Sequence, residues 1–472
     1  MADYEAWTRE QLVERILQLE SKKKPTAQTE NGPTSHPNNP RLFNFQAYAQ
    51  RKIALKFCYH GWDYNGLAYQ VTPTPLPTVE GVLFDALCKA RLIDREAGFE
   101  GCDWSRCGRT DRGVSSAGQV VALRMRCSLR PVETVQPFEE AEVTPPTQPS
   151  TKSEPPELEV KYIQVLNRIL PPSIRVLAWA PVDDTFSARF NCRYRHYKYF
   201  FQPLNPPASP LNIDKMRNAA SLLVGEHDFR NFCKLDGSKQ IERYDRRVVS
   251  ATISRLTSPT IQGEKPMYVF DLVGSAFLWH QVRHIMGVLF LVGQGLEDAS
   301  IVNALLNTDS SRPSFDPSLP LLECRPLYDM AEGLPLVLWE CGFDQKDIRW
   351  RTDEWDGDGE VPALTGTSSV HLLETMESST EATDIKGMML KHFQQVASQY
   401  HRHPDVGADS VVRIQAGGGR IRHVTQYLPL LKRKRGPTPA DVNENWRKGH
   451  AHILARRGVR IHGDDEQQGE SE

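Results

Sequence analysis

The chain repeatedly alternates between strand-like and helix-like segments, and this alternation constrains its fold more than any other feature. Apolar side chains at every second position predict strands within residues 53–59, 119–127, 195–202 and 268–273. Helical spacing of apolar side chains predicts helices at residues 79–92, 213–224 and 281–291. Strands and helices that alternate along a chain pack as helices against a sheet, so the sequence predicts an α/β or α+β protein.

Other segments contain too few apolar residues to build a core. Residues 8–20 predict a short amphipathic helix, which a polar, flexible link joins to the folded part. Residues 128–158 contain seven prolines and six acids, which predicts a disordered insertion. Residues 351–410 hold eleven acids against four basic residues, whereas residues 411–460 hold twelve basic residues against two acids.

The formal net charge of -2, taken at face value, argues against a nucleic-acid-binding protein. That sum results from cancellation, because residues 49–127 carry +3 and residues 411–460 carry +10. Against these stand -4 in the insertion, -7 in residues 351–410 and -5 in the last twelve residues. The net charge of the whole chain therefore does not exclude a nucleic-acid-binding protein, because basic segments are present although the sum is nearly neutral.

Motifs for metals, cofactors and membranes are missing from the sequence. The nine cysteines include no C-x-x-C pair, which excludes zinc ribbons and fits a reducing compartment. His401-x-His403 and His450-x-His452 have no third ligand near them in sequence. The longest apolar run, Met286–Gly293, is too short to cross a bilayer. We therefore expect no metal, no cofactor and no membrane partner.

The loop at residues 106–114 places one carboxylate, Asp111, among the arginines Arg106, Arg109 and Arg112. Neighbouring positive charge lowers the pKa of a carboxylate and keeps it ionised. An ionised carboxylate with a free lone pair can attack an electrophilic carbon, so Asp111 is a candidate nucleophile. The alternative is a solvated turn, because Asp and Gly are ordinary turn residues.

Two further segments carry candidate functional side chains. Aromatic and basic residues alternate over residues 193–199, which predicts tyrosines on one strand face for base stacking and cations on the other for phosphate contact. Packed core is the alternative for these aromatic residues. In the predicted helix at residues 281–291, Arg283 lies near the start, where it can reach a carboxylate across a cleft. A surface cation is the alternative for Arg283.

Taken in order, these segments closely resemble three motifs of the TruA-type tRNA pseudouridine synthases. They read Gly108-Arg109-Thr110-Asp111-x-Gly113-Val114, then Phe186-x-Ala188-Arg189-Phe190 with Arg195-x-Tyr197-x-Tyr199, then Ala276-Phe277-Leu278-x-His280-x-Val282-Arg283. The resemblance runs from about residue 50 to residue 344. Within the family, the N-terminal helix, the segments at residues 60–66 and 229–236 and the basic tail look most like the eukaryotic branch, which acts on positions 38 and 39 of the tRNA anticodon stem-loop.

The resemblance implies a role for each matching residue. Asp111 would be the nucleophile that isomerises uridine to pseudouridine after the target base has flipped out of the RNA. Tyr197 would stack on the flipped base and help to remove its C5 proton. Arg283 would pair with Asp111 and keep it charged, and Arg109 would take the place of the flipped nucleotide. The other loop arginines would contact the substrate, namely Arg106 and Arg112.

The resemblance also implies an α+β fold in which two ferredoxin-like α/β subdomains form one extended mixed sheet around a central catalytic cleft. The expected organisation is an N-terminal helix and linker (1–48), two catalytic subdomains (49–202 and 203–345), an acidic linker (346–410) and a basic extension (411–472). Members of the family use no cofactor and commonly act on tRNA as homodimers. We expect a nuclear and cytoplasmic protein.

Two alternatives to this function remain open. One is a noncatalytic tRNA-binding or chaperone protein of the same fold, although the intact Asp111, Tyr197 and Arg283 set argues against it. The other is a TruA-type synthase with another uridine target, on which the shared motifs carry no information.

Overall fold

A computed structural model describes residues 43–128, 159–203, 210–256, 266–312, 315–361, 367–401 and 411–456 of the chain. The predicted helix at residues 8–20 and all but the first residue of the predicted insertion at 128–158 lie outside these residues. From Phe45 onward the described residues belong to one compact unit. The expected subdomain boundaries at residues 202 and 345 therefore remain predictions.

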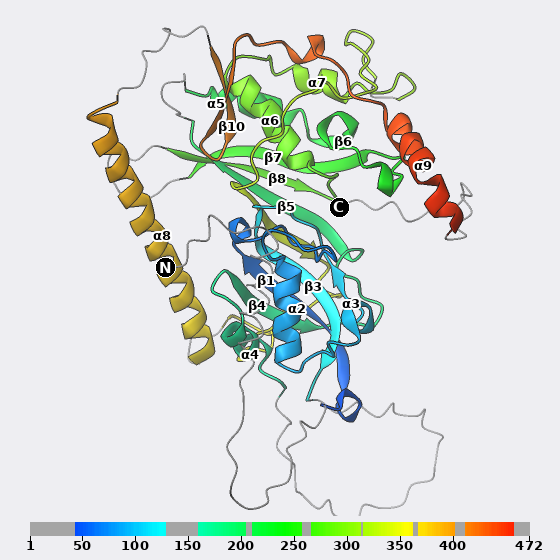
Figure 1. Cartoon of the computed structure of the whole chain (residues 1–472), viewed down its shortest axis with the longest axis vertical. Helices are drawn as coiled ribbons and strands as arrows, with labels where there is room; N and C mark the ends of the chain where they lie inside the picture. Colours follow the sequence, from blue (N-terminus) through cyan, green and yellow to red (C-terminus); the bar gives the residue numbers. More distant parts are fainter. Residues whose placement is uncertain are drawn as a thin grey trace, which may run out of the picture. The chain divides into compact units, whose positions relative to one another are not determined.

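A mixed sheet of nine strands runs through the described part of this unit (Figure 1). Eight strands lie in the order β4-β1-β3-β9-β5-β8-β7-β6, and β2 pairs with β3 outside this path. The strands are β1 (Gln50–Tyr59), β2 (Ser105–Arg106), β3 (Ser115–Arg126), β4 (Ile174–Pro181), β5 (Cys192–Phe201), β6 (Gly225–Asp228), β7 (Asp245–Leu256), β8 (Met267–Gly274) and β9 (Leu336–Phe343).

The two halves of the sheet meet where β3 and β9 run parallel, with Ser115 opposite Val337 and Ser116 opposite Leu338. All other neighbours among the described strands of this sheet pair antiparallel. A mostly antiparallel sheet with helices packed on it is an α+β architecture, so the predicted fold class with one extended mixed sheet is confirmed.

The N-terminal half packs α2 (Val79–Lys89) and α4 (Tyr162–Ile169) against β1, β3 and β4, with the short α3 (Gly98–Gly101) nearby. Ile53, Leu55 and Phe57 occupy every second position of β1 and are fully buried in this core. α2 begins where the Thr78 side chain accepts a hydrogen bond from the Gly81 N–H, which caps the first turn. The period-two and helical patterns of the sequence thus predicted β1, β3 and α2 of this half, whereas α4 and β4 were not predicted.

The C-terminal half packs α5 (Ile213–Ser221), α6 (Gln281–Gly293) and α7 (Ile301–Leu306) against the other strands. α6 is buried along almost its whole length. A helix that is apolar all round must be covered on every side. The segment before β9 covers part of it so closely that a Cβ at Gly287 would lie 2.8 Å from the Asp329 carbonyl oxygen. This contact packs the middle of α6 closely against the segment before β9.

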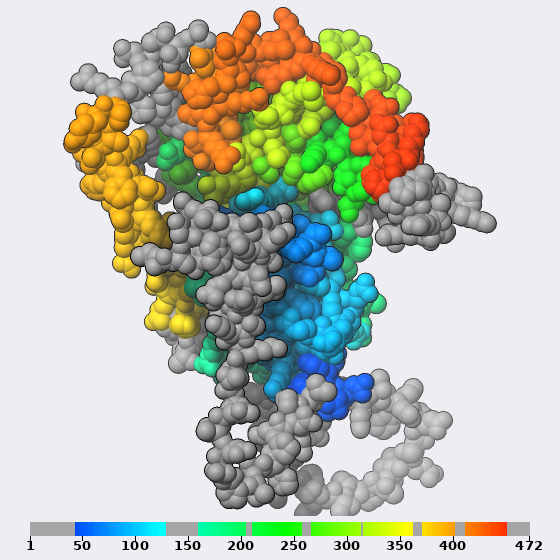
Figure 2. All heavy atoms as spheres, viewed as in Figure 1, coloured from blue at the N-terminus to red at the C-terminus, as the bar shows by residue number. Residues whose placement is uncertain are grey.

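The basic extension packs onto this half, as the orange and red atoms of Figure 2 show. It contains the hairpin β10 (Val412–Gly417) and β11 (Arg420–Val424) and the helix α9 (Pro439–Arg456). The Gln415 N–H donates to Gln294 Oε1 at 2.8 Å, and Leu430 is fully buried. Gly417 lies so close to the Tyr199 hydroxyl that any Cβ would overlap with it. The described part of the extension therefore packs into the hydrophobic core and is not an unpacked tail.

The predicted acidic linker at 346–410 contains a helix, α8 (Thr367–Ser398). The sequence did not predict this helix, because polar side chains are interspersed among its apolar ones and no apolar stripe is evident. The residues before α8 contact the N-terminal half, where the Asp353 carboxylate accepts hydrogen bonds from the Ile163 and Gln164 N–H groups at 3.2 and 2.8 Å. These contacts cap the start of α4.

Candidate active site

A pocket opens beside the loop that precedes β3 and the first turn of α6. It brings together residues from all three sequence motifs, since its lining includes Arg109, Asp111, Tyr197, His280 and Arg283. These residues are far apart in sequence, and the junction of the two sheet halves places them side by side. The pocket is therefore the candidate active site.

The loop that carries Asp111 is held by close backbone contacts. The Leu67 N–H donates to the Thr110 carbonyl at 3.1 Å, and the Thr110 hydroxyl lies 2.7 Å from the Tyr59 hydroxyl at the end of β1. Gly66 has a φ of +94° and leaves no room for a side chain, because a Cβ would lie 2.9 Å from the Thr110 carbonyl oxygen. The loop is thus rigid where it presents Asp111.

One oxygen of Asp111 binds two donors from α6 and its N-cap. Arg283 Nη1 lies 3.1 Å and His280 Nε2 lies 3.2 Å from Asp111 Oδ2. Burial alone would raise the pKa of Asp111, but the hydrogen bond from His280 and the charges of His280 and Arg283 outweigh it and hold the pKa below its ordinary value. Asp111 is thus ionised at neutral pH, and its side chain is 24% exposed to the pocket.

Arg283 is itself oriented by the segment before β9. Its Nε donates to the Ala331 carbonyl oxygen at 2.8 Å, and the Ala331 N–H donates back to the Arg283 carbonyl oxygen at 2.9 Å. The neighbouring Glu332 N–H donates to the Ala416 carbonyl oxygen of β10 at 2.8 Å. The hairpin, the Ala331 segment and the guanidinium therefore form one connected set of contacts behind Asp111.

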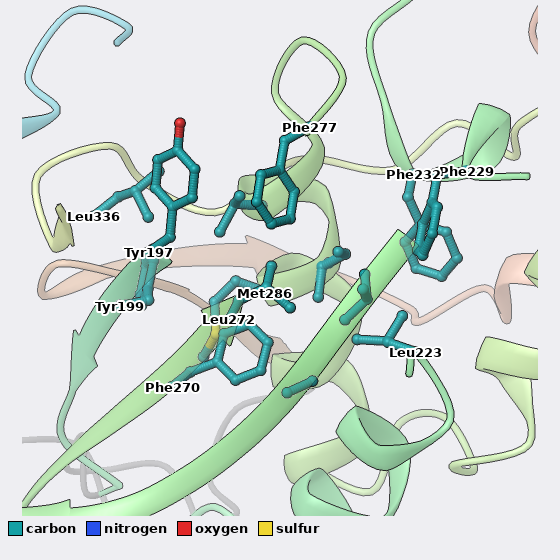
Figure 3. Packing of buried hydrophobic residues seen from close by; sticks show 14 of the residues in the cluster. Tyr197, Tyr199, Leu223, Phe229, Phe232, Phe270, Leu272, Phe277, Met286 and Leu336 are labelled. Carbon is teal, nitrogen blue, oxygen red and sulfur yellow. The ribbon is translucent and has the colours of Figure 1, made fainter. Parts of the chain in front are cut away.

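Tyr197 projects from β5 toward the pocket, between Leu336 and Phe277 (Figure 3). Its ring makes an edge contact with Phe277 at a centroid distance of 5.2 Å, and its hydroxyl points away from the packed cluster around Met286. Burial raises the pKa of Tyr197 well above its ordinary value, so the side chain stays a neutral phenol. The aromatic face is held in place by packing.

The expectation that tyrosines and cations occupy opposite faces of β5 is wrong for its most buried cation. Arg195 lies on the same face as Tyr197 and Tyr199, and all three are buried. Its guanidinium donates to three backbone carbonyls, those of Ser275, Cys107 and Arg189, at 2.9, 2.8 and 3.2 Å. Period-two spacing puts residues 195, 197 and 199 on one face of the strand. The Arg195 side chain therefore hydrogen-bonds to the backbone of neighbouring loops and does not face RNA phosphates.

The three loop arginines have different surroundings. Arg109 and Arg112 are exposed, and Arg109 lines the pocket. Arg106 donates through Nε to Oε1 of the fully buried Glu80 at 2.5 Å, so its charge compensates a buried carboxylate. The sequence could not reveal this pair, because Glu80 lies 26 positions earlier on α2.

His280 belongs to the third sequence motif, but the sequence alone predicts no function for its side chain. The structure places its imidazole against Asp111, and its backbone adopts the left-handed conformation with a φ of 63°. The only sequence signal for its place in the pocket is its position three residues before Arg283, since residues three apart lie on the same side of a helix.

The described residues contain neither a candidate metal site nor a candidate membrane helix. They contain no group of three or more His, Cys, Asp or Glu side chains placed to hold a metal ion. None of their helices is long and apolar enough to span a membrane.

Comparison with known proteins identifies the family. The profile of the tRNA pseudouridine synthase family matches residues 219–344. The tRNA pseudouridine(38/39) synthase of Saccharomyces cerevisiae is 40% identical, over 94% of this chain and 92% of the yeast protein. The Bos taurus protein of the same name is 37% identical, over 78% of this chain and 70% of its own length. The tRNA pseudouridine synthase A of Methanosarcina mazei is 30% identical, over 64% of this chain and 88% of its own length. With these similarities along most of its length, the chain belongs to the TruA-type family of tRNA pseudouridine synthases.

Proposed function

We propose that this chain isomerises uridine to pseudouridine at positions 38 and 39 of tRNA. The substrate positions are supported by relatives that carry them in their names and align over most of this chain. The chemistry is supported by a single observation above all, an ionised Asp111 held in the pocket by Arg283 and His280 beside Tyr197.

The reaction breaks the bond between N1 of uracil and C1′ of ribose and forms a bond between C5 and C1′. The base then loses its C5 proton and gains a proton at N1, so the atoms balance without any other reactant. Asp111 attacks C1′ or steers a glycal-type intermediate. Both donors bind Oδ2, and no described residue donates to Oδ1, so Oδ1 is the oxygen available to react with the sugar.

The other site residues bind and place the flipped nucleotide. Tyr197 offers its ring for stacking, and its raised pKa disfavours a phenolate base for the C5 proton. Arg109 lines the pocket and takes the space that the flipped nucleotide vacates. Arg112 is exposed next to Asp111 in the loop and contacts phosphate, whereas Arg106 acts through its pair with Glu80.

The direct test is to incubate the full chain with unmodified tRNA and to map pseudouridine base by base. Product at positions 38 and 39 is expected. Product only at other uridines would favour a TruA-type synthase with another target. Stoichiometric tRNA binding without product would favour the noncatalytic tRNA-binding or chaperone protein.

Replacing Arg283 by glutamine is expected to make the reaction more sensitive to acid. The folded protein lowers the pKa of Asp111, so activity is present above that pKa and is lost as the pH falls through it. Loss of a cation in contact raises a carboxylate pKa by about one unit or more. The acid limb of the single-turnover rate against pH should therefore move upward. Arg283→Lys keeps the charge and is the control, and an unmoved limb in Arg283→Gln would contradict the pairing.

We further propose that exposed cations of the basic extension bind tRNA phosphates without selecting the modified position. Lys432→Gln combined with Lys434→Gln should weaken tRNA binding and lower the slope of log affinity against log salt by about one per lost contact. Point variants are preferable to deletion, because Leu430 beside them is fully buried in the core. Lys346→Gln, with a side chain 70% exposed, is the control. Unchanged affinity and slope would instead assign the run at 432–435 to nuclear import or a protein partner.

Homodimerisation and a nuclear and cytoplasmic location are also proposals, the first from the family resemblance and the second from the cysteine usage, which fits a reducing compartment. The mass of the full chain in solution, measured with and without tRNA, tests the first. Imaging of the tagged protein, with and without the Lys432 and Lys434 substitutions, tests the second.

A further inference from the structure

His280 adopts a backbone conformation that its residue type disfavours. Its φ of 63° and ψ of 10° match the third position of a type II turn, where glycine or asparagine usually stands. The turn is closed twice, because the Gln281 N–H donates to the Leu278 carbonyl at 3.0 Å and the Leu278 N–H donates to Gln281 Oε1 at 2.7 Å. Strained positions of this kind persist where the surroundings enforce them, and they concentrate at functional sites.

The imidazole of His280 makes one polar side-chain contact, and that contact is with Asp111. Nε2 lies 3.2 Å from Asp111 Oδ2, whereas Nδ1 is buried and has no partner among the described residues. The side chain is 10% exposed and its ring lies against Trp279 at a centroid distance of 4.7 Å. Lys234 Nζ covers the Trp279 ring at 4.2 Å. Packing therefore holds the ring in place, and its one paired nitrogen serves Asp111.

We propose that His280 is a positioning residue for the nucleophile, an inference that rests on the proposed function. His280, at the N-cap of α6, and Arg283, in its first turn, both contact Oδ2. Together they restrain the orientation of the Asp111 carboxylate. A single donor would allow the carboxylate to rotate about its contact with Arg283. With both donors in place, Oδ1 stays directed toward the sugar carbon.

Three substitutions of His280 separate positioning from turn stability. In His280→Gln the amide nitrogen reaches about as far as imidazole Nε2 but suits the turn poorly. In His280→Asn and His280→Gly the residue suits the turn but cannot reach Oδ2. Misplacement of a reacting group by about 1 Å costs roughly 10²-fold in rate, so the Asn and Gly variants should lose about that much in single-turnover rate. His280→Gln should stay within about 5-fold of wild type, since it keeps the donor that orients the carboxylate.

The order of melting temperatures should be the reverse, with the Asn variant at least as stable as the Gln variant. Affinity for tRNA should change little in all three variants. Arg91→Gly is the matched control, because Arg91 also has a positive φ of 55° but is exposed and lies just beyond the end of α2, and the rate of this variant should stay at the wild-type value.

Two results would overturn the positioning role. One is a wild-type rate in His280→Asn and His280→Gly. The other is a rank order of rates among the three variants that matches the rank order of their melting temperatures. In either case wild-type protein still forms pseudouridine, so the proposed function stands. Absence of product from wild-type protein would refute the proposed function itself.

Discussion

Replacing Asp111 by alanine is expected to lower pseudouridine formation by roughly 10⁴-fold or more, the loss typical of removing an essential nucleophile. No other described carboxylate lines the pocket, so no neighbour replaces it. The fold should survive, because Arg283 keeps its hydrogen bond to the Ala331 carbonyl oxygen after the carboxylate is removed. Single-turnover rates measured with saturating protein, together with tRNA affinity and thermal melting, separate loss of chemistry from loss of folding.

Asp183→Asn is the matched control for this experiment. Asp183 is also an aspartate in a turn, where it accepts hydrogen bonds from Thr185, and it does not line the pocket. Its substitution should leave the rate unchanged. If the Asp111→Ala protein retained a rate within roughly 10²-fold of wild type, Asp111 would not be the nucleophile.

Replacing Arg195 by methionine is expected to destabilise the protein by about 3 to 5 kcal/mol, because the carbonyl groups of Cys107, Ser275 and Arg189 lose a charged donor and each such hydrogen bond contributes about 1.5 kcal/mol. Methionine fills much of the same volume, so the loss reports mainly on hydrogen bonding. The three carbonyls belong to the loop before Asp111, the Arg189 loop and the turn before α6. Equilibrium unfolding in urea measures the change in free energy.

Arg193→Met tests the same change on an exposed side chain two positions earlier on β5. A surface substitution of this kind usually changes stability by less than about 0.5 kcal/mol. Equal effects of the two substitutions would show that Arg195 contributes no more than an exposed cation does.

Much of the fold and the contact between Asp111 and Arg283 could be predicted from sequence. Strands and helices such as β1 and α6 have strong local periodicity, so apolar spacing alone located them within a few residues. The pairing of Asp111 with Arg283 is implied by the three motifs taken together, because an aspartate in a turn and an arginine at a helix start are each ordinary on their own. The structure joins them at 3.1 Å across 172 positions of sequence.

The remaining site features depend on contacts that local patterns do not encode. Arg195 has the composition of a phosphate-binding residue, but its partners are backbone carbonyls from three distant segments. The basic extension has the composition of a free tail, yet Gly417 and Leu430 pack against the core. The positive φ of His280 follows from a turn whose geometry depends on the packing around it.

The origin of the active-site residues has a consequence for protein synthesis. The loop of Asp111 belongs to the half of the sheet that is translated first, whereas its partners His280 and Arg283 follow about 170 positions later. At 5 to 20 residues per second, the ribosome needs roughly 10 to 30 s to add that length. Until then the emerging carboxylate lacks the donors that lower its pKa and orient it. A nascent chain can therefore form the loop of Asp111 well before the contacts that orient its carboxylate exist.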